Sequence, residues 1–108
     1  MKVVITGGAG FVGTNLSRHL LARGHDVKIL DDLSSGLESN VPEGEQFIKG
    51  SIVDSQLVKQ TIAGVDAVVH LGARGSVPRS IKNPIATHEV NATGTLNVLE
   101  GARAANAH

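Results

Sequence analysis

Three glycines near the start of the chain are spaced so that their backbone could hold a phosphate group. Gly7, Gly10 and Gly13 follow the apolar run 3–5 and precede the helix-forming run 14–23. A pyrophosphate needs backbone N–H groups at close range without Cβ atoms in the way, and the beginning of a helix adds partial positive charge. We expect Gly7 and Gly10 to make a tight turn that approaches the anion, and Gly13 to let the helix pack against the strand. A glycine-rich turn that binds nothing is the alternative.

Two acidic residues stand where a second part of the same ligand would be held. Asp31 and Asp32 end the next apolar run, 26–30. They follow the glycines by roughly 20 residues, the separation typical of a carboxylate that accepts hydrogen bonds from a ribose 2′-hydroxyl. Such a carboxylate repels a 2′-phosphate, and no Lys or Arg occurs between residues 33 and 40. The pattern predicts a dinucleotide site with NAD favoured over NADP, although Asp also commonly ends a strand and begins a turn.

Other reactive side chains are scarce. The chain contains no Cys, Trp or Tyr, so we expect neither disulfides nor thiol chemistry. Its 5 histidines lack the spacing typical of metal ligands, and we predict no metal site. Lys59 and Lys82 fall on different predicted elements and have no tyrosine to pair with. The sequence therefore predicts no catalytic residue within these 108 positions.

The elements that must position these residues alternate between strand and helix. The pattern predicts strands over 2–6, 26–30, 46–49 and 66–71, helices over 11–23, 55–63 and 84–105, and loops over 33–45 and 72–82. Gly24 and Gly64 suit the ends of the first and second helices, and Asp54 and the pair Asn83-Pro84 suit the beginnings of the second and third.

The strands read as buried on both faces. The runs Val3-Val4-Ile5 and Ala67-Val68-Val69 do not alternate with polar residues, as is typical of parallel strands covered by helices. Right-handed crossovers then give the strand order 3-2-1-4. The predicted fold is α/β: a Rossmann-type doubly wound parallel sheet, present in part, with about four strands.

Two apolar surfaces of this half-sheet lack a predicted cover. The strand 66–71 would be an edge without a neighbour, and the last helix carries Leu96, Val98 and Leu99. Because unpaired edges tend to associate, we expect a homodimer, an edge-strand association or a place within a larger domain.

The composition excludes several classes of partner. The chain has 10 basic and 10 acidic residues and a formal net charge of zero, so it carries no basic footprint for nucleic acid. No apolar run approaches the length of a membrane span, and no charge run suggests a membrane surface. The length suits one domain. Because the sequence shows neither a secretory signal nor a membrane span, we expect that domain to be cytoplasmic.

Several motifs in order resemble one protein family. They are the run Val4 to Gly13, Asp31-Asp32-Leu33-Ser34-Ser35-Gly36, His70-Leu71-Gly72-Ala73, Ser76-Val77-Pro78-Arg79-Ser80 and Asn91-Ala92-Thr93-Gly94-Thr95-Leu96-Asn97-Val98-Leu99-Glu100. Together they resemble the extended short-chain dehydrogenase/reductases, and within them the NAD-dependent nucleotide-sugar epimerases and dehydratases, above all the UDP-glucose 4-epimerase group. The resemblance extends from Met1 to about Arg103.

The resemblance implies a role in cofactor binding for seventeen positions. These are Gly7, Gly10, Phe11, Val12 and Gly13 at the pyrophosphate, Asp31, Asp32, Ser34, Ser35 and Gly36 at the adenosine ribose, Ser51 and Ile52 at the adenine, Leu71, Gly72, Ala73 and Arg74 along the nicotinamide half, and Asn91 in support. From the residues alone, 71–73 is equally a plain strand exit, Asn91 a surface residue and 76–80 a solvated loop.

Three of these positions depart from the family pattern. Ser51 replaces a usual Asp, and a hydroxyl accepts a weaker hydrogen bond from the adenine amino group than a carboxylate does. Gly72 replaces a usual Ala, which keeps the small size that close approach requires. Arg74 stands where a Gln or another long polar residue is common.

The resemblance also implies what these 108 residues lack. The family's hydride transfer to and from NAD depends on a Tyr-x-x-x-Lys pair with an upstream Ser or Thr, and neither that part nor the substrate domain is present. We therefore expect residues 1–108 to be the N-terminal NAD-binding portion of a 4-epimerase of the UDP-glucose/UDP-galactose type, inactive alone, with a nucleotide-sugar substrate in the complete enzyme. The alternatives are a 4,6-dehydratase or decarboxylase of the same family, a non-catalytic dinucleotide-binding module, and an interaction piece without a ligand.

Overall fold

Strands and helices alternate along the chain in the computed structural model, which describes residues 1–34, 39, 45–73 and 77–108. The strands are β1 (Lys2–Thr6), β2 (Asp26–Asp31), β3 (Gln46–Lys49) and β4 (Ala67–His70). The helices are α1 (Phe11–Ala22), α2 (Ser55–Ile62), α3 (Val77–Lys82), α4 (Pro84–His88), the π-helix η2 (Glu89–Gly94) and α5 (Thr95–Ala105).

All described strand pairs are parallel, in the order β3-β2-β1-β4. In the centre of the sheet Val4 lies opposite Lys28 on one side and Val68 on the other. This order confirms the predicted half of a doubly wound sheet, in which the carboxyl ends of the strands meet at one edge.

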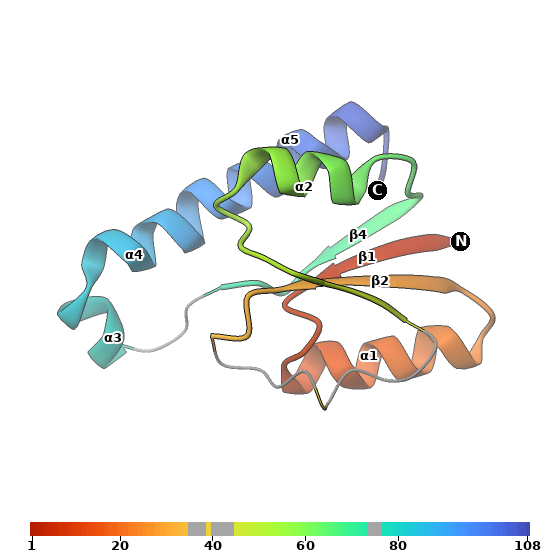
Figure 1. Cartoon of the computed structure of the whole chain (residues 1–108), viewed down its shortest axis with the longest axis horizontal. Helices are drawn as coiled ribbons and strands as arrows, with labels where there is room; N and C mark the ends of the chain where they lie inside the picture. The colour runs from red at the N-terminus through yellow and green to blue at the C-terminus, as the bar shows by residue number, and fades with distance from the viewer. Residues whose placement is uncertain (35–38, 40–44, 74–76) are drawn as a thin grey trace.

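Helices cover both faces of the sheet (Figure 1). Helix α1 lies on one face, and α2 and α5 lie together on the other. The α1 side buries Val3, Ile5, Val27 and Ile29, and the α2–α5 side buries Val4, Leu30, Ile52, Val58, Ile62, Val65 and Val98. Both faces of the central strands β1 and β2 are therefore apolar core, as the unbroken apolar run of β1 predicts.

The last helix differs in two ways from its prediction. Three segments, α4, η2 and α5, continue one another, and the π-helix interrupts the α-helix that we expected over 84–105. Val98 is buried, with 3% of its surface exposed, so the expectation that it lacks cover is wrong, whereas Leu96 and Leu99 remain exposed. Asn83 begins this helix as expected, because its side-chain oxygen accepts a hydrogen bond from the Ala86 N–H at 3.2 Å.

The predicted loop over 72–82 contains a short helix, α3. Pro78 is the second residue of that helix, where a missing N–H group removes no intrahelical hydrogen bond. A proline in an otherwise weak helical pattern reads as a breaker, and this is why the sequence interpretation was wrong there.

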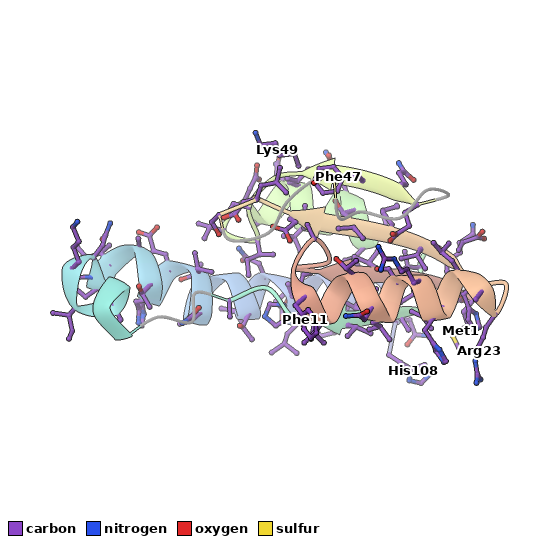
Figure 2. The ribbon with its side chains drawn as sticks, turned by 90° about the horizontal axis from the view of Figure 1, so that it is seen from below. Met1, Phe11, Arg23, Phe47, Lys49 and His108 are labelled. Atoms are coloured by element: carbon purple, nitrogen blue, oxygen red, sulfur yellow. The ribbon has the colours of Figure 1, made fainter. Side chains whose placement is uncertain are left out.

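The outer edge of β4 is partly paired, contrary to the expectation that it has no neighbour. Asn106 adopts a left-handed conformation (φ 55°) that turns the chain back after α5. The backbone of His108 then bonds to two residues of this edge: its N–H donates to the Asp66 carbonyl at 3.1 Å, and its carbonyl accepts from the Val68 N–H at 2.8 Å. Figure 2 places His108 at the same end of the molecule as Met1.

Candidate functional site

A cleft opens where the carboxyl ends of the strands converge. Its walls come from the turn after β1, the end of β2, the segment after β3, the exit of β4 and the π-helix. The lining residues are Gly7, Gly10, Leu30, Asp31, Asp32, Ser34, Gly50, Ile52, Leu71, Gly72, Ala73 and Val90. In doubly wound sheets this is the edge at which ligands bind.

The glycine turn forms one end of the cleft. Gly7 has a φ of +72°, and a Cβ there would lie 2.8 Å from the backbone carbon of Leu71, so conformation and space both require glycine. Gly10 precedes α1, and the first helical bond runs from the Thr14 N–H to the Gly10 carbonyl at 2.9 Å. The N–H groups of residues 11–13 therefore have no intrahelical acceptor and are suited to an anion.

Gly13 has a different neighbour from the one that the sequence suggested. A Cβ on Gly13 would lie 2.6 Å from the Gly7 carbonyl oxygen and 2.6 Å from the Gly8 Cα. Gly13 therefore lets α1 begin against the glycine turn itself rather than against the strand. Its role is to hold that turn closed onto the helix.

Phe11 and Val12 point away from the protein. Their exposed fractions are 85% and 61%, and Figure 2 shows Phe11 at the beginning of α1. Their side chains do not line the cleft, so a contribution to an anion site would come from their backbone N–H groups.

Asp31 connects the glycine turn to the end of β2. One of its carboxylate oxygens accepts from the Ala9 N–H at 3.0 Å, and the other accepts from the Leu33 N–H at 2.8 Å. Asp32 accepts from the Ser34 N–H at 2.9 Å, and Leu33 between them adopts a positive φ of 63°. The two carboxylates thus shape a tight turn at the cleft wall, as Asp side chains often do.

The opposite wall is fixed from the helix layer. The side-chain amide of Asn97 on α5 donates to the Ile52 carbonyl at 2.9 Å and to the Val53 carbonyl at 3.1 Å. Gly94 packs so closely that a Cβ there would lie 2.5 Å from the Ile52 side chain. Ser51 lies beside this wall, and its hydroxyl accepts from the Val53 N–H at 3.1 Å.

The exit of β4 is held by a chain of hydrogen bonds across three elements. The Thr6 hydroxyl oxygen accepts from the Leu71 and Gly72 N–H groups, both at 3.1 Å, and lies 2.6 Å from His70 Nδ1. The other ring nitrogen, Nε2, lies 3.0 Å from the Thr95 hydroxyl. Burial lowers the pKa of His70 below its ordinary value, because the charged imidazolium loses hydration there.

The structure gathers about half of the predicted site residues around the cleft. Those lining it are Gly7, Gly10, Asp31, Asp32, Ser34, Ile52, Leu71, Gly72 and Ala73. Phe11, Val12, Gly13 and Ser51 lie beside it without lining it, and Ser35, Gly36 and Arg74 fall outside the described residues. Asn91 is exposed in the π-helix, where its carbonyl accepts from the Thr95 hydroxyl at 2.7 Å.

Sequence reasoning missed three lining residues, Leu30, Gly50 and Val90. Gly50 directly follows β3, so the rule that placed Asp31 after β2 could have found it. Val90 belongs to the π-helix, and no pattern in the sequence signals that it faces the cleft. Within the described ranges, no group of three or more His, Asp or Glu side chains is arranged to hold a metal ion.

Comparison with known proteins gives one consistent family. The model of the "NAD dependent epimerase/dehydratase family" matches residues 3–108. A UDP-glucose 4-epimerase of Lactobacillus helveticus is 37% identical over 108 residues, which are 98% of this chain and 33% of that protein. UDP-glucuronic acid decarboxylase 1 of Danio rerio is 36% identical over 98 residues, 91% of this chain and 23% of that protein.

The fold matches solved structures equally well. The Thermus thermophilus UDP-glucose 4-epimerase, solved in complex with NAD, superposes with a TM-score of 0.89 at 38% identity, covering 100% of this chain and 35% of that one. The chain therefore spans about a third of the length of the epimerases that it matches. Within the described part of the chain, no helix is long and apolar enough to cross a bilayer.

Proposed function

Because the chain belongs to the NAD dependent epimerase/dehydratase family, we propose that residues 1–108 are the NAD-binding portion of a longer nucleotide-sugar 4-epimerase of the UDP-glucose type. The observation that supports this best is that the Asp31 carboxylate, bonded to the Ala9 N–H of the glycine turn, lines the same cleft as Gly7 and Gly10. The turn offers N–H groups and the carboxylate offers acceptors, at the strand edge where dinucleotides bind.

The residues present offer the chemical groups that NAD requires. The N–H groups of residues 11–13 would hold the pyrophosphate, and Asp31 with Asp32 would hold the ribose hydroxyls. The buried Ile52 would contact the adenine, with Ser51 beside it. The β4 exit at Leu71–Ala73 would follow the nicotinamide half, where Gly72 leaves room, and Ser35, Gly36, Arg74 and Asn91 remain predicted contacts.

The similarity to UDP-glucose 4-epimerases, at 37% identity to one relative and 38% to one solved structure, supports the 4-epimerase assignment. The 36% identity to UDP-glucuronic acid decarboxylase 1 supports the alternative, a decarboxylase or dehydratase of the same family. Both groups would use the same cofactor cleft, so the distinction depends on residues beyond those of this chain. A cytoplasmic location and a nucleotide-sugar substrate in the complete enzyme are part of this proposal.

We expect residues 1–108 to bind NAD without turning over a sugar. Bound NAD supplies a hydride acceptor, but moving the sugar's hydroxyl proton needs an acid–base group, and the sequence has no tyrosine. The residues at the cleft can bind and orient the cofactor through backbone N–H groups, two carboxylates and apolar walls.

The last helical segments leave apolar side chains exposed. Ile85 on α4 is 72% exposed, and Leu96 and Leu99 on α5 are 58% and 62% exposed. Exposed apolar side chains of this kind suit an interface, and they support the predicted homodimer.

The test of the proposed function is calorimetric titration of the 108-residue chain with NAD and, separately, with NADP. Saturable binding with NAD preferred is the expected result. A folded sample that binds neither nucleotide would contradict an autonomous cofactor site, and equal binding of both would contradict the ribose assignment.

Asp31→Ala should weaken NAD binding and narrow its preference over NADP. The substitution removes the acceptors for the ribose hydroxyls and the charge that repels a 2′-phosphate, and also the bond to the Ala9 N–H. We expect the Kd for NAD to rise by roughly tenfold to a hundredfold, which corresponds to about 1.4–2.7 kcal/mol. Asp66→Ala, on the opposite end of the sheet, is the control for removal of a carboxylate, and unchanged affinity in Asp31→Ala would contradict the assignment.

A further inference from the structure

His70 lies behind the cleft rather than in it, and its two ring nitrogens connect β1 with α5. We propose that His70 is a positioning residue whose neutral form, with the proton on Nε2, holds the Leu71–Gly72 wall of the cleft, and that protonation of His70 releases this wall. The inference rests on the proposed function, since it makes cofactor affinity depend on pH. Its first test needs no cofactor.

The hydrogen bonds determine which ring nitrogen carries the proton. The Thr95 hydroxyl donates its only proton to the Asn91 carbonyl at 2.7 Å, so towards His70 it can only accept. Nε2 must therefore be the donor. In a neutral imidazole Nδ1 is then the acceptor, and the Thr6 hydroxyl donates to it across 2.6 Å.

The hydrogen bonds of the Thr6 hydroxyl lead to the same tautomer of His70. The hydroxyl oxygen accepts the Gly72 N–H, and it shares the Leu71 N–H with the Thr6 carbonyl, which lies 2.9 Å from that nitrogen. Because its lone pairs face these two groups, its own proton is the one directed at Nδ1. The hydrogen bonds of Thr95 and those of Thr6 therefore both indicate that Nε2 donates and Nδ1 accepts.

A second proton on the ring would break this arrangement. Protonated Nδ1 becomes a donor aimed at a Thr6 hydroxyl that is itself donating and already accepts from backbone N–H groups. Thr6 would have to turn its proton away and give up its contacts with Leu71 and Gly72. These two residues line the cleft, so the loss of a proton acceptor behind the wall alters the wall itself.

Hydroxyl groups, not charges, face His70 from the described elements around it. Thr6 comes from β1 and Thr95 from α5. The charged groups on these elements have other partners or face solvent. Lys2 on β1 is exposed, and the Asp66 carboxylate before β4 accepts from the Lys2 N–H. On α5, Glu100 pairs with Arg103. On η2 Glu89 is exposed, and His108, paired with β4 through its backbone, is exposed as well. The lowered pKa of His70 is accordingly an effect of burial.

The sign of the pH dependence follows from this. An unfolded histidine titrates at about 6.5, and the folded protein disfavours the charged form, so the unfolded state binds the proton more readily. The stabilisation from neutral His70 is complete above about pH 6.5 and is lost as the pH falls from there towards the lower pKa of the folded state. Cofactor affinity should fall in the same direction, with a Kd that rises by up to about tenfold per pH unit.

The first experiment is long-range ¹H–¹⁵N correlation NMR of the imidazole groups in the cofactor-free chain between pH 5 and 8. The expected result is that His70 shows the pattern of the Nε2–H tautomer at pH 8, and that its pKa lies below the ordinary value for histidine. An Nδ1–H pattern, or a His70 pKa at or above the ordinary value for histidine, would overturn the proposal whether or not the chain binds NAD.

The second experiment measures the Kd for NAD over the same pH range in matched variants. His70→Asn places a carbonyl oxygen near the Nδ1 position, so it can accept from Thr6 but cannot titrate. We expect it to bind within about threefold of the wild type at pH 8 and to lose the acid-side rise in Kd. His70→Leu lacks the acceptor and should bind NAD weakly at every pH. As a control, His19→Asn at an exposed position should show the same change of Kd with pH as the wild type.

The outcomes separate this inference from the proposed function. If His70→Asn keeps the wild-type rise in Kd at low pH, His70 is not the group responsible. If His70→Leu binds as tightly as the wild type at pH 8, the wall does not depend on the bond. If neither the wild type nor any variant binds NAD, the proposed function fails. The tautomer and the pKa measured by NMR would then still decide the structural part of the inference.

Discussion

Gly10→Val should raise the Kd for NAD by at least about a hundredfold, or about 2.7 kcal/mol, while the chain stays folded. Gly10 lines the cleft at the beginning of α1, and a Cβ added there would meet only the Gly7 oxygen, at 3.4 Å. Its backbone angles (φ −80°, ψ 179°) are accessible to valine. The branched side chain would therefore occupy the space above the turn, where the proposed pyrophosphate lies, without a clash inside the protein.

The controls for this substitution use the same position. Gly10→Ala adds one methyl group, so its effect on the Kd should lie between those of the wild type and of valine. Valine is a poorer helix-capping residue than glycine, which costs about 1 kcal/mol, and thermal unfolding would show a correspondingly small shift. Normal NAD binding by a folded Gly10→Val chain would mean that the turn is only structural.

Gly13→Ala should lower the free energy of unfolding more than Gly10→Val does. Its Cβ would overlap the Gly7 oxygen and the Gly8 Cα, both at 2.6 Å, and neither is a flexible side chain that could move aside. The helix and the turn would have to separate. We expect a loss of about 3 kcal/mol in the free energy of unfolding, a large part of the stability of a small domain. Thermal or urea unfolding measures it, and NAD binding should weaken together with it.

Gly101→Ala is the matched control for Gly13→Ala. Gly101 is also a buried glycine within a helix, but a Cβ there would meet the flexible end of Ile62, at 3.2 Å. Alanine improves helix propensity by up to about 1 kcal/mol at both positions, so the difference between the two variants isolates the overlap with the turn. Equal unfolding free energies for the two variants would contradict the packing role of Gly13.

The sheet could be predicted from the sequence because two of its strands, β1 and β4, contain continuous apolar runs. Runs such as Val3-Val4-Ile5 are buried on both faces only when helices cover both, and right-handed crossovers then leave one order for the strands. The π-helix could not be predicted, because its residues Glu89–Gly94 have no distinctive pattern and its geometry depends on packing against other parts of the fold. The return of His108 to β4 depends on the left-handed Asn106, which is a common but not an obligatory helix end.

The site was predictable where chemistry and chain position coincide. Gly7, Gly10 and Asp31 combine a residue type that the ligand needs with a place at the end of a strand. Thr6, His70 and Asn97 lie in the motifs quoted above, but they were assigned no role because single hydroxyl, imidazole or amide groups carry no spacing signal. Their importance comes from partners distant in the sequence, such as Thr6 and His70, which are 64 positions apart and which only the fold brings together.

The hydrogen bond from the Ala9 N–H to the Asp31 carboxylate has a consequence for the kinetics of binding. It joins the glycine turn to the end of β2 without any ligand, so the two parts of the cleft are already in register when a cofactor arrives. Little of the backbone has to rearrange in the encounter, and association is then limited by diffusion and orientation. Differences among natural or engineered variants of this cleft should accordingly lie in how long the cofactor stays, not in how fast it enters.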